Sequence, residues 1–574
     1  MKKKLILSSL IIILVIIGVF FTLNKINENK RNYEIEDISE FKYFVMKEND
    51  KFGVIDATGK IIIQATYDKV EIPNPSKDVF ICYKNEKGIA MNSNNQQLFA
   101  EYNSIEGIEL KNAVNSLNFE KSVLKTEKNG QYGLIDFTGK RILNTEYSSI
   151  EGITGIEGEL KVQKNEKCGV ANIKGTILVK CEYDTVEGDN YFNEDNKHGF
   201  IVGNKNENGY NYGYINNKGK LILKLEYNDI SRVTDIQTDE GLYFIAAKNG
   251  QYGVMKNKKP IVKCENQAIE YDKTNKIFII QKGKNYGVAD IEGKVLIPIE
   301  NTSIESKGEY IYVEKNNIRE VYDKSGNKAK VEYNKIILPT SNENYKIVIN
   351  SEENSNYYGV IDNNGKEVIK TDYLYIEYAF DNYFISCGKN GKLGVIDSNG
   401  KTVIDLKYDL VQKMQGKNFI QTLYSETNTT EIYAEDMKEI CKMQNANVET
   451  KNDYIKLYSN KEIKYIDNSG KIIASSKLFP DKKIYASSRD DKWGYVDSNG
   501  KVVVNYEYEL CTELNAYGYA AVKKNGKWGA IDSNGNIVVD PKYELNENYN
   551  GINFIGEYVE VNTGFGNTYF TKNI

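Results

Sequence analysis

The residue types that could carry out a reaction are few in this chain and lie far apart. Its one histidine, His198, stands beside Gly199 after a polar stretch, Asn193–Lys197. Acid–base and nucleophilic catalysis need a base placed beside a nucleophile or a second acid, and no G-x-S-x-G, H-E-x-x-H or phosphate-cradling motif occurs. We interpret His198 as an exposed loop residue and expect no catalytic residue. A hydrolase whose carboxylates converge only in the fold is an alternative hypothesis.

The cysteines give no sign of a metal site. They number seven, contain no C-x-x-C pair, and stand at positions 82, 168, 181, 264, 387, 441 and 511. Zinc needs clustered thiolates or imidazoles, so we expect neither a bound metal nor a cofactor. Small buried hydrophobic groups are the expected role, and a disulfide between Cys168 and Cys181 stays open.

Three Asp-Ser-Asn-Gly stretches, which begin at Asp397, Asp497 and Asp532, resemble the start of a calcium-binding loop. Calcium requires six to eight oxygen ligands, including a distal bidentate carboxylate. The residues that follow these stretches supply no such carboxylate. We therefore interpret them as tight turns, in which the Asp carboxylate accepts backbone amides and the Gly takes the left-handed conformation.

These turns belong to a repeat that fills the chain from about residue 41, as in KWGYVDSNGKVVVNYEYEL (492–510). Counted from the first Gly of the unit, an Asp stands three residues later, a second Gly six residues later and a Tyr fourteen residues later. The first Gly stands at 53, 88, 133, 169, 213, 253, 287, 359, 394, 494, 529 and 566, and the Tyr at 67, 102, 147, 183, 227, 373, 408, 508 and 543. Eroded copies centre on Glu320 and Lys464, with one more near Glu431, which makes fifteen units, the last truncated.

Each unit predicts a meander of three strands whose third strand is apolar on both faces. Such a strand needs cover on both sides, which stacked neighbouring units can supply. We predict an all-β fold of two propeller-like rings in tandem, with about eight units in residues 41–336 and about seven in 337–574. The seam is expected at residues 337–342, and the half-unit at Tyr558–Phe570 could close the last ring. An open β-solenoid is the alternative.

The Trp-Gly steps at Lys492-Trp493-Gly494 and Lys527-Trp528-Gly529, with the D-x-x-G-K turn and the later Tyr, resemble the bacterial WG-containing repeat. The resemblance covers nearly everything from residue 42 onward. It implies an all-β and often exported protein, and it brings no catalytic residues. Elsewhere the Trp position holds Phe, Tyr, Cys or Leu, so we interpret both this position and the repeated Tyr as packing positions. Exposed aromatic platforms for ligands are the alternative.

The N-terminus predicts a membrane tether. Three lysines precede nineteen uncharged residues, Leu5–Leu23, which as a helix would be roughly 28 Å long, near the thickness of a bilayer core. We predict a signal-anchor helix in residues 1–24 and a stalk in 25–40, with a cleaved signal as the alternative. The lysine block favours the N-terminus inside, which places the repeats outside the cytoplasm at the cell membrane.

The net charge of −5, with no basic stripe, argues against a nucleic-acid partner. Because the sequence lacks reaction chemistry, we expect a binding scaffold for a cell-wall, peptide or protein ligand. Variable loops such as 107–121 and 189–211 would supply the specificity. A structural spacer or assembly element of the cell surface is the alternative function.

Overall fold

The computed structural model describes residues 41–111, 117–189, 198–207, 209–234, 236, 241–332, 334–352, 355–459, 461–544, 552–562 and 568–572. The predicted signal-anchor (1–24) and stalk (25–40) lie outside these residues. Within them, no helix has both the length and the apolar character needed to cross a membrane.

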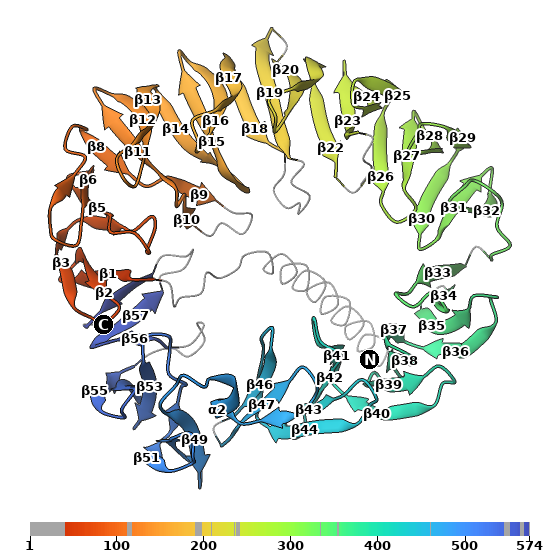
Figure 1. Cartoon of the computed structure of the whole chain (residues 1–574). Coiled ribbons are helices and arrows are strands. Elements are labelled where there is room, and N and C mark those ends of the chain that lie inside the picture. The colour runs from red at the N-terminus through yellow and green to blue at the C-terminus, as the bar shows by residue number, and fades with distance from the viewer. Residues whose placement is uncertain are drawn as a thin grey trace, which may run out of the picture.

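The described chain forms one closed circle of fourteen small antiparallel sheets, which we call blades 1 to 14 in chain order (Figure 1). The prediction of an all-β, propeller-like repeat fold is confirmed. The blades form one ring of fourteen, where two rings of about eight and seven units were expected. The fifteenth unit is not a blade of its own, because its strands join the sheet of the first unit. The residues expected to form the seam, 337–342, begin inside strand β33 of blade 9, which pairs with β34.

Most blades contain four consecutive strands; blade 1 has six, blades 8 and 13 have three, and β9 and β10 form a separate ribbon. Blades 1 to 5 contain β1 (Tyr43–Glu48), β2 (Lys51–Asp56), β3 (Ile61–Tyr67); β4 (Lys69–Glu71), β5 (Phe80–Lys84), β6 (Lys87–Met91), β7 (Gln97–Leu98); β8 (Ser104–Glu106), with the ribbon β9 (Glu109–Lys111) and β10 (Leu117–Phe119), β11 (Val123–Lys128), β12 (Gln131–Asp136), β13 (Arg141–Tyr147); β14 (Ser149–Ile153), β15 (Ile156–Lys164), β16 (Lys167–Asn172), β17 (Ile177–Tyr183); and β18 (Thr185–Gly188), β19 (Gly199–Asn206), β20 (Gly209–Asn216), β21 (Leu221–Tyr227).

Blades 6 to 10 contain β22 (Asp229–Val233), β23 (Tyr243–Lys248), β24 (Gln251–Lys256), β25 (Lys259–Asn266); β26 (Ala268–Asp272), β27 (Ile277–Lys282), β28 (Asn285–Asp290), β29 (Val295–Asn301); β30 (Ser303–Lys307), β31 (Tyr310–Lys315), β32 (Ile318–Asp323); β33 (Lys335–Pro339), β34 (Tyr345–Glu352), β35 (Ser355–Asp362), β36 (Glu367–Tyr373); and β37 (Tyr375–Phe380), β38 (Tyr383–Cys387), β39 (Leu393–Asp397), β40 (Thr402–Tyr408).

Blades 11 to 14 contain β41 (Leu410–Lys413), β42 (Ile420–Tyr424), β43 (Thr429–Tyr433), β44 (Glu439–Gln444); β45 (Asn447–Thr450), β46 (Tyr454–Tyr458), β47 (Ile463–Asp467), β48 (Ile472–Ile473); the short helix α2 (Ser475–Leu478) followed by β49 (Tyr485–Arg489), β50 (Lys492–Val496), β51 (Val502–Tyr508); and β52 (Leu510–Cys511), β53 (Tyr519–Lys524), β54 (Lys527–Asp532), β55 (Ile537–Tyr543). Blade 1 is completed by β56 (Phe554–Ile555), β57 (Tyr558–Asn562) and β58 (Thr568–Thr571).

The first strand of a four-stranded blade faces the centre of the ring and the last lies on its outer rim (Figure 1). The sequence predicted only three strands per unit and missed this inner strand. In blade 2 it is β4, three residues long with Val70 as its one aliphatic residue. So short a segment carries too little alternation to indicate a strand.

The outer strand of ten blades pairs with its neighbour through the same β-bulge. In blade 14, Trp528 lies opposite Tyr543 and Ala530 opposite Val539, with a register shift between them. Gly529 stands at this shift, where a Cβ atom would lie 2.4 Å from the carbonyl oxygen of Val539. The first Gly of the repeat is therefore required because two backbones approach closely, which is typical of a glycine within a strand.

The hydrophobic core is divided into clusters between successive blades. Trp528, Val539 and Tyr543 of blade 14 pack with Phe554 and Val559 of blade 1. Each outer strand thus obtains its cover from the neighbouring blade, as its apolar pattern predicted. The ring is closed within blade 1, where β1 and β58 run parallel with Met46 opposite Phe570.

Candidate functional site

The structure corrects the interpretation of His198 as an exposed loop residue. Its side chain is only 19% exposed, and Nε2 lies 2.7 Å from Oε2 of Glu159 in blade 4. The hydrogen bond with Glu159 raises the pKa of the imidazole. The contact joins blades 4 and 5, so it stabilises the packing of neighbouring blades.

A buried ion pair makes the same kind of contact between blades 5 and 6. Arg232 Nε lies 2.8 Å from Asp189 Oδ2, with side chains 3% and 1% exposed, and the Tyr214 hydroxyl and the Gly199 amide also donate to Asp189. Burial raises the pKa of Asp189 despite these donors. With its lone pairs occupied in this way, the carboxylate links two blades.

Blade 13 has no inner strand, and a carboxylate reaches across the resulting opening. Glu513 follows β52 of blade 14, and its Oε1 accepts a hydrogen bond of 3.0 Å from the hydroxyl of Tyr465 in blade 12. Tyr465 packs edge-on against Phe479, just after α2. Burial raises the pKa of Glu513. The residue that follows α2 thus packs against blade 12, in the segment that leads into blade 13.

The three Asp-Ser-Asn-Gly stretches form turns, as interpreted. In each, the Asp Oδ1 accepts the backbone amides two and four residues later, at 2.9 Å and 2.9 Å for Asp397, the same for Asp497, and 2.8 Å and 2.9 Å for Asp532. Among the described residues, no three His, Cys, Asp or Glu side chains gather as a set of metal ligands.

The cysteines and repeated aromatic residues are packing groups. All seven thiols are free, including Cys168 and Cys181, and each is buried or half-buried; burial raises the pKa of Cys82 to about 12. The Trp-position residues lie directly opposite the repeated Tyr on the next strand, as Trp493 does opposite Tyr508. None of these aromatic side chains is exposed in the described residues, which confirms the packing interpretation.

The loops expected to vary differ in their structure. Segment 107–121 carries the extra ribbon β9–β10, which Glu120 helps to hold by accepting the Ser122 amide at 2.9 Å and the Gly158 amide of blade 4 at 3.3 Å. Segment 189–211, in contrast, contains β19 and the start of β20, so much of it is regular sheet.

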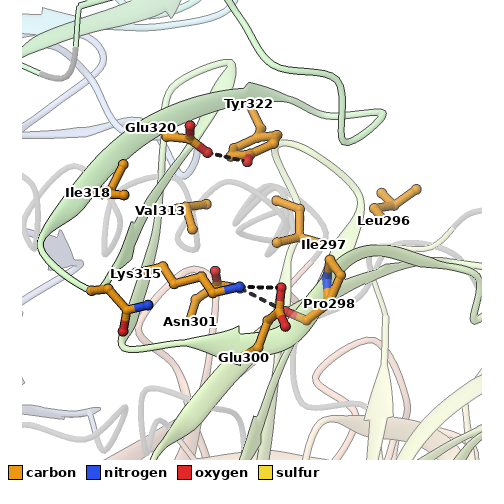
Figure 2. A pocket seen from close by; sticks show the side chains of 11 residues that line it. Leu296, Ile297, Pro298, Glu300, Asn301, Val313, Lys315, Ile318, Glu320 and Tyr322 are labelled. Atoms are coloured by element: carbon orange, nitrogen blue, oxygen red, sulfur yellow. Dashed lines mark hydrogen bonds and ion pairs between the residues drawn. The ribbon is translucent and has the colours of Figure 1, made fainter.

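The strongest candidate site is a pocket of about 320 Å³ on the outer rim between blades 7 and 8. Figure 2 shows aliphatic side chains on both sides, Ile297 and Pro298 of β29 on one and Val313 and Ile318 of blade 8 on the other; six of the eleven lining residues are polar. Blade 8 consists of three strands only, and β32 is its outermost strand. The pocket thus lies beside the one outer-rim position in the described sheets where a fourth strand is missing.

Two ion pairs border this pocket. Lys315 Nζ lies 2.6 Å from Glu300 Oε1 (Figure 2). Lys328, outside the lining, has its Nζ 2.6 Å from Glu320 Oε1. The hydrogen bonds from Lys328 and Tyr322 hold the pKa of Glu320 below its ordinary value, and the bond to Glu320 raises that of Tyr322 to about 12. A glycosidase-type general acid needs a raised pKa, and the pKa of Glu320 is shifted in the opposite direction.

The sequence carries a signal for this site at two positions where the repeat pattern is broken. Glu320 replaces the repeat Gly, and Asn301 replaces the repeat Tyr in the preceding unit. Asn301 is 4% exposed and donates to the carbonyl oxygens of Tyr286 and Pro298. Its side chain is smaller than the tyrosine found at this position in most blades, although blade 6 also has an asparagine there, Asn266, with equivalent hydrogen bonds.

The family described as the WG containing repeat matches five stretches of the chain, residues 52–87, 212–252, 394–420, 493–528 and 528–550. No curated protein matches the chain.

Solved structures resemble it only distantly. A eukaryotic initiation factor is 9% identical over 63% of this chain and 94% of its own, with a TM-score of 0.26. Hsv2 of Kluyveromyces lactis is 10% identical over 46% and 91%, with a TM-score of 0.21. The extracellular domain of a hybrid two component system from B. thetaiotaomicron is 10% identical over 90% and 80%, with a TM-score of 0.18. The matched stretches carry the glycine, turn and aromatic positions seen in the blades, so the chain contains WG containing repeats at these five places.

Proposed function

We propose that this protein is a non-catalytic binding scaffold for a peptide, protein or cell-wall polymer. The observation that carries the proposal is the contrast between the filled spaces separating regular blades and the open pocket beside blade 8. The repeated aromatic residues are occupied in packing, and the carboxylates of Glu159, which is half-buried, and Asp189 join neighbouring blades. The pocket offers both aliphatic and polar side chains to a ligand, and such concave sites commonly bind ligands.

We further propose that residues 5–23 tether the ring to the cell membrane, with the repeats outside the cytoplasm. The support is the apolar stretch behind three lysines. Protease added to intact cells should then digest the repeat region; its complete protection, under conditions in which lysed cells release digested fragments, would contradict the orientation.

The alternative functions have less support. A spacer gains length from added repeats, whereas these repeats close on themselves, so an extra blade would widen the ring. For a hydrolase, the carboxylates that share the pocket are ion-paired, and the pKa of Glu320 is lowered. We propose no nucleic-acid partner, because the charge is near balance and slightly negative.

The scaffold proposal is tested by measuring whether immobilised ligands retain the protein. Full-length protein in detergent micelles is passed over purified cell-wall polymer and over immobilised secreted proteins, with bare matrix as the control. Binding to either beyond the bare matrix supports the scaffold function. Failure to bind both would contradict it.

A further inference from the structure

We propose that blade 8 binds an extended segment of a partner protein, which adds to β32 as the missing fourth strand and places a large apolar side chain in the pocket. This inference deepens the proposed binding function and rests on it. It names the class of ligand, an extended peptide, and the site, the outer edge of blade 8.

The reason why blade 8 lacks its own fourth strand lies in two residues. In regular blades the third residue of the outer strand is a buried aliphatic, such as Ile63, Val504 or Val539. The same position after the Asp-x-x-Gly turn of blade 8 is Lys330, which is exposed. A lysine placed there would carry its charge into an apolar core, at a high cost in free energy.

The second residue explains the pocket itself. The fifth residue of a regular outer strand packs against the preceding blade, as Leu225 does against the core of blade 4 and Leu406 against that of blade 9. The corresponding residue of blade 8 is Glu332, which is exposed and 3.2 Å from Lys335. No side chain of blade 8 therefore enters the space beside blade 7 from this position.

The chain does begin to form a fourth strand. The amide of Ala329 donates to the carbonyl oxygen of Val321 at 2.8 Å, and Tyr322 forms an isolated bridge with Lys328. Residues 330–332 then leave the sheet. The outer edge of β32 toward Ile318 is the part that remains available for a strand from another chain, and peptides commonly bind sheet edges in this way.

The pocket also defines the chemistry of the incoming segment. Five of its eleven lining residues are aliphatic and six are polar, and Ile318 at the edge is 63% exposed. Lysines and glutamates at its border already pair with each other, Lys315 with Glu300 and Lys328 with Glu320. A segment with an uncharged, large apolar side chain at the pocket would bury this surface without separating either pair.

The chain itself supplies a probe with these properties. Strand β51 ends in Asn505-Tyr506-Glu507-Tyr508, and Tyr506 is its fifth residue. A fluorescent peptide with the sequence of residues 501–508 should bind the full-length protein saturably, as measured by fluorescence anisotropy. The peptide with Tyr506→Ala, and one with N-methyl groups on alternate backbone amides, should each bind at least about tenfold more weakly, since one removes the pocket side chain and the other the backbone donors.

Matched variants of the protein separate this site from nonspecific binding. Ile318→Glu places a charge at the pocket, while Val295→Glu places one on another exposed aliphatic residue, 55% exposed in the outer strand of blade 7. We expect Ile318→Glu to weaken peptide binding at least about tenfold and Val295→Glu to leave it unchanged. The double variant Lys330→Val/Glu332→Leu, which should restore the fourth strand of blade 8, should also abolish binding.

Several results would overturn the inference: no saturable binding of the unmodified peptide, equal binding by the Ile318→Glu and Val295→Glu variants, or normal binding of the N-methylated peptide. Undiminished binding by a folded Lys330→Val/Glu332→Leu variant would do the same. If wild-type protein is retained on polymer or protein columns and Ile318→Glu does not reduce that retention, the scaffold function stands and only the assignment to blade 8 fails.

Discussion

Blades 14 and 8 contain the same central hairpin, but only blade 14 covers it with an outer strand. In blade 14, Trp528 and Gly529 face β55, and the space toward blade 1 is filled by apolar side chains. In blade 8 the same two positions hold Arg319 and Glu320, and the outer strand is missing. The difference indicates that the repeat motif encodes the attachment of the outer strand, while the hairpin forms with or without it.

Substitutions at the Trp position should give the largest difference in stability between blades 14 and 8. Trp528→Ala removes a side chain that is 2% exposed, which costs about 3–5 kcal/mol in a packed core. Arg319→Ala, at the same position of blade 8, truncates a side chain that is 63% exposed, and the change should stay within about 0.5 kcal/mol. Thermal unfolding followed by circular dichroism compares the two variants. Equal destabilisation would show that the Trp position does not hold the outer strand.

Substitutions at the first Gly of the repeat should give the next largest difference in stability between the two blades. Gly529→Ala brings a Cβ atom within 2.4 Å of a backbone oxygen of β55, and we expect a loss of about 1–3 kcal/mol, as for other overpacked sites. In blade 8 no outer strand approaches Glu320, so Glu320→Ala should lose only its surface pair with Lys328, below about 1 kcal/mol. Denaturant unfolding measures both changes. If Gly529→Ala proved as mild as Glu320→Ala, the bulge would have to tolerate a side chain.

A third experiment converts blade 8 toward blade 14. The variant Lys330→Val/Glu332→Leu should build the outer strand and stabilise the protein by about 1 kcal/mol, because the burial of two apolar side chains exceeds the cost of ordering the segment. Hydrogen exchange at the amides of Ile318–Glu320 should slow. Lys180→Val, on an exposed position of the outer strand of blade 4, is the control and should change neither quantity. Unchanged exchange in the double variant would mean that other residues keep the strand away.

The same contrast shows how far the sequence alone could lead. The turns, the hairpins and the packing role of Trp493 and Trp528 could be predicted because each depends on a local pattern repeated many times. The inner strands, such as β4, and the closure of fourteen blades into one ring could not, because they depend on the angle between neighbouring blades. The pocket depends on two positions, 301 and 332, that hold Asn and Glu in place of the larger or apolar side chains of regular blades. These positions lie thirty-one residues apart in the sequence, so no local pattern links them.

A further eroded blade tests whether a charged residue can replace the glycine without loss of the outer strand. Blade 11 keeps all four strands although Glu431 holds the glycine position. Regular blades have two register shifts, as at Trp528/Ala530 and Ala530/Ile531, whereas blade 11 has only the second, between Ile432 and Tyr433. Glu431 is buried and paired: Lys442 Nζ lies 2.6 Å from Oε1, and the hydroxyls of Tyr408 and Tyr433 donate to Oε2 at 2.5 Å and 2.6 Å.

This pairing predicts a pH dependence that is specific to blade 11 and smaller than the effects of the core substitutions. Burial alone would raise the pKa of Glu431, but the hydrogen bonds from Lys442, Tyr408 and Tyr433 outweigh it and hold the pKa below its ordinary value. A carboxyl with a lowered folded-state pKa stabilises the fold above its unfolded-state pKa and loses that contribution as the pH falls through the folded-state value. We expect wild-type stability to decline more steeply below about pH 5 than that of Glu431→Gln, which keeps the size of the side chain without its charge. Thermal unfolding between neutral and acidic pH measures this difference, with Glu435→Gln, at an exposed position in the following turn, as the control. Parallel pH profiles for wild type and Glu431→Gln would mean that the paired carboxylate does not hold the outer strand of blade 11. The continuous pairing across the glycine position would then have to explain why that strand is retained.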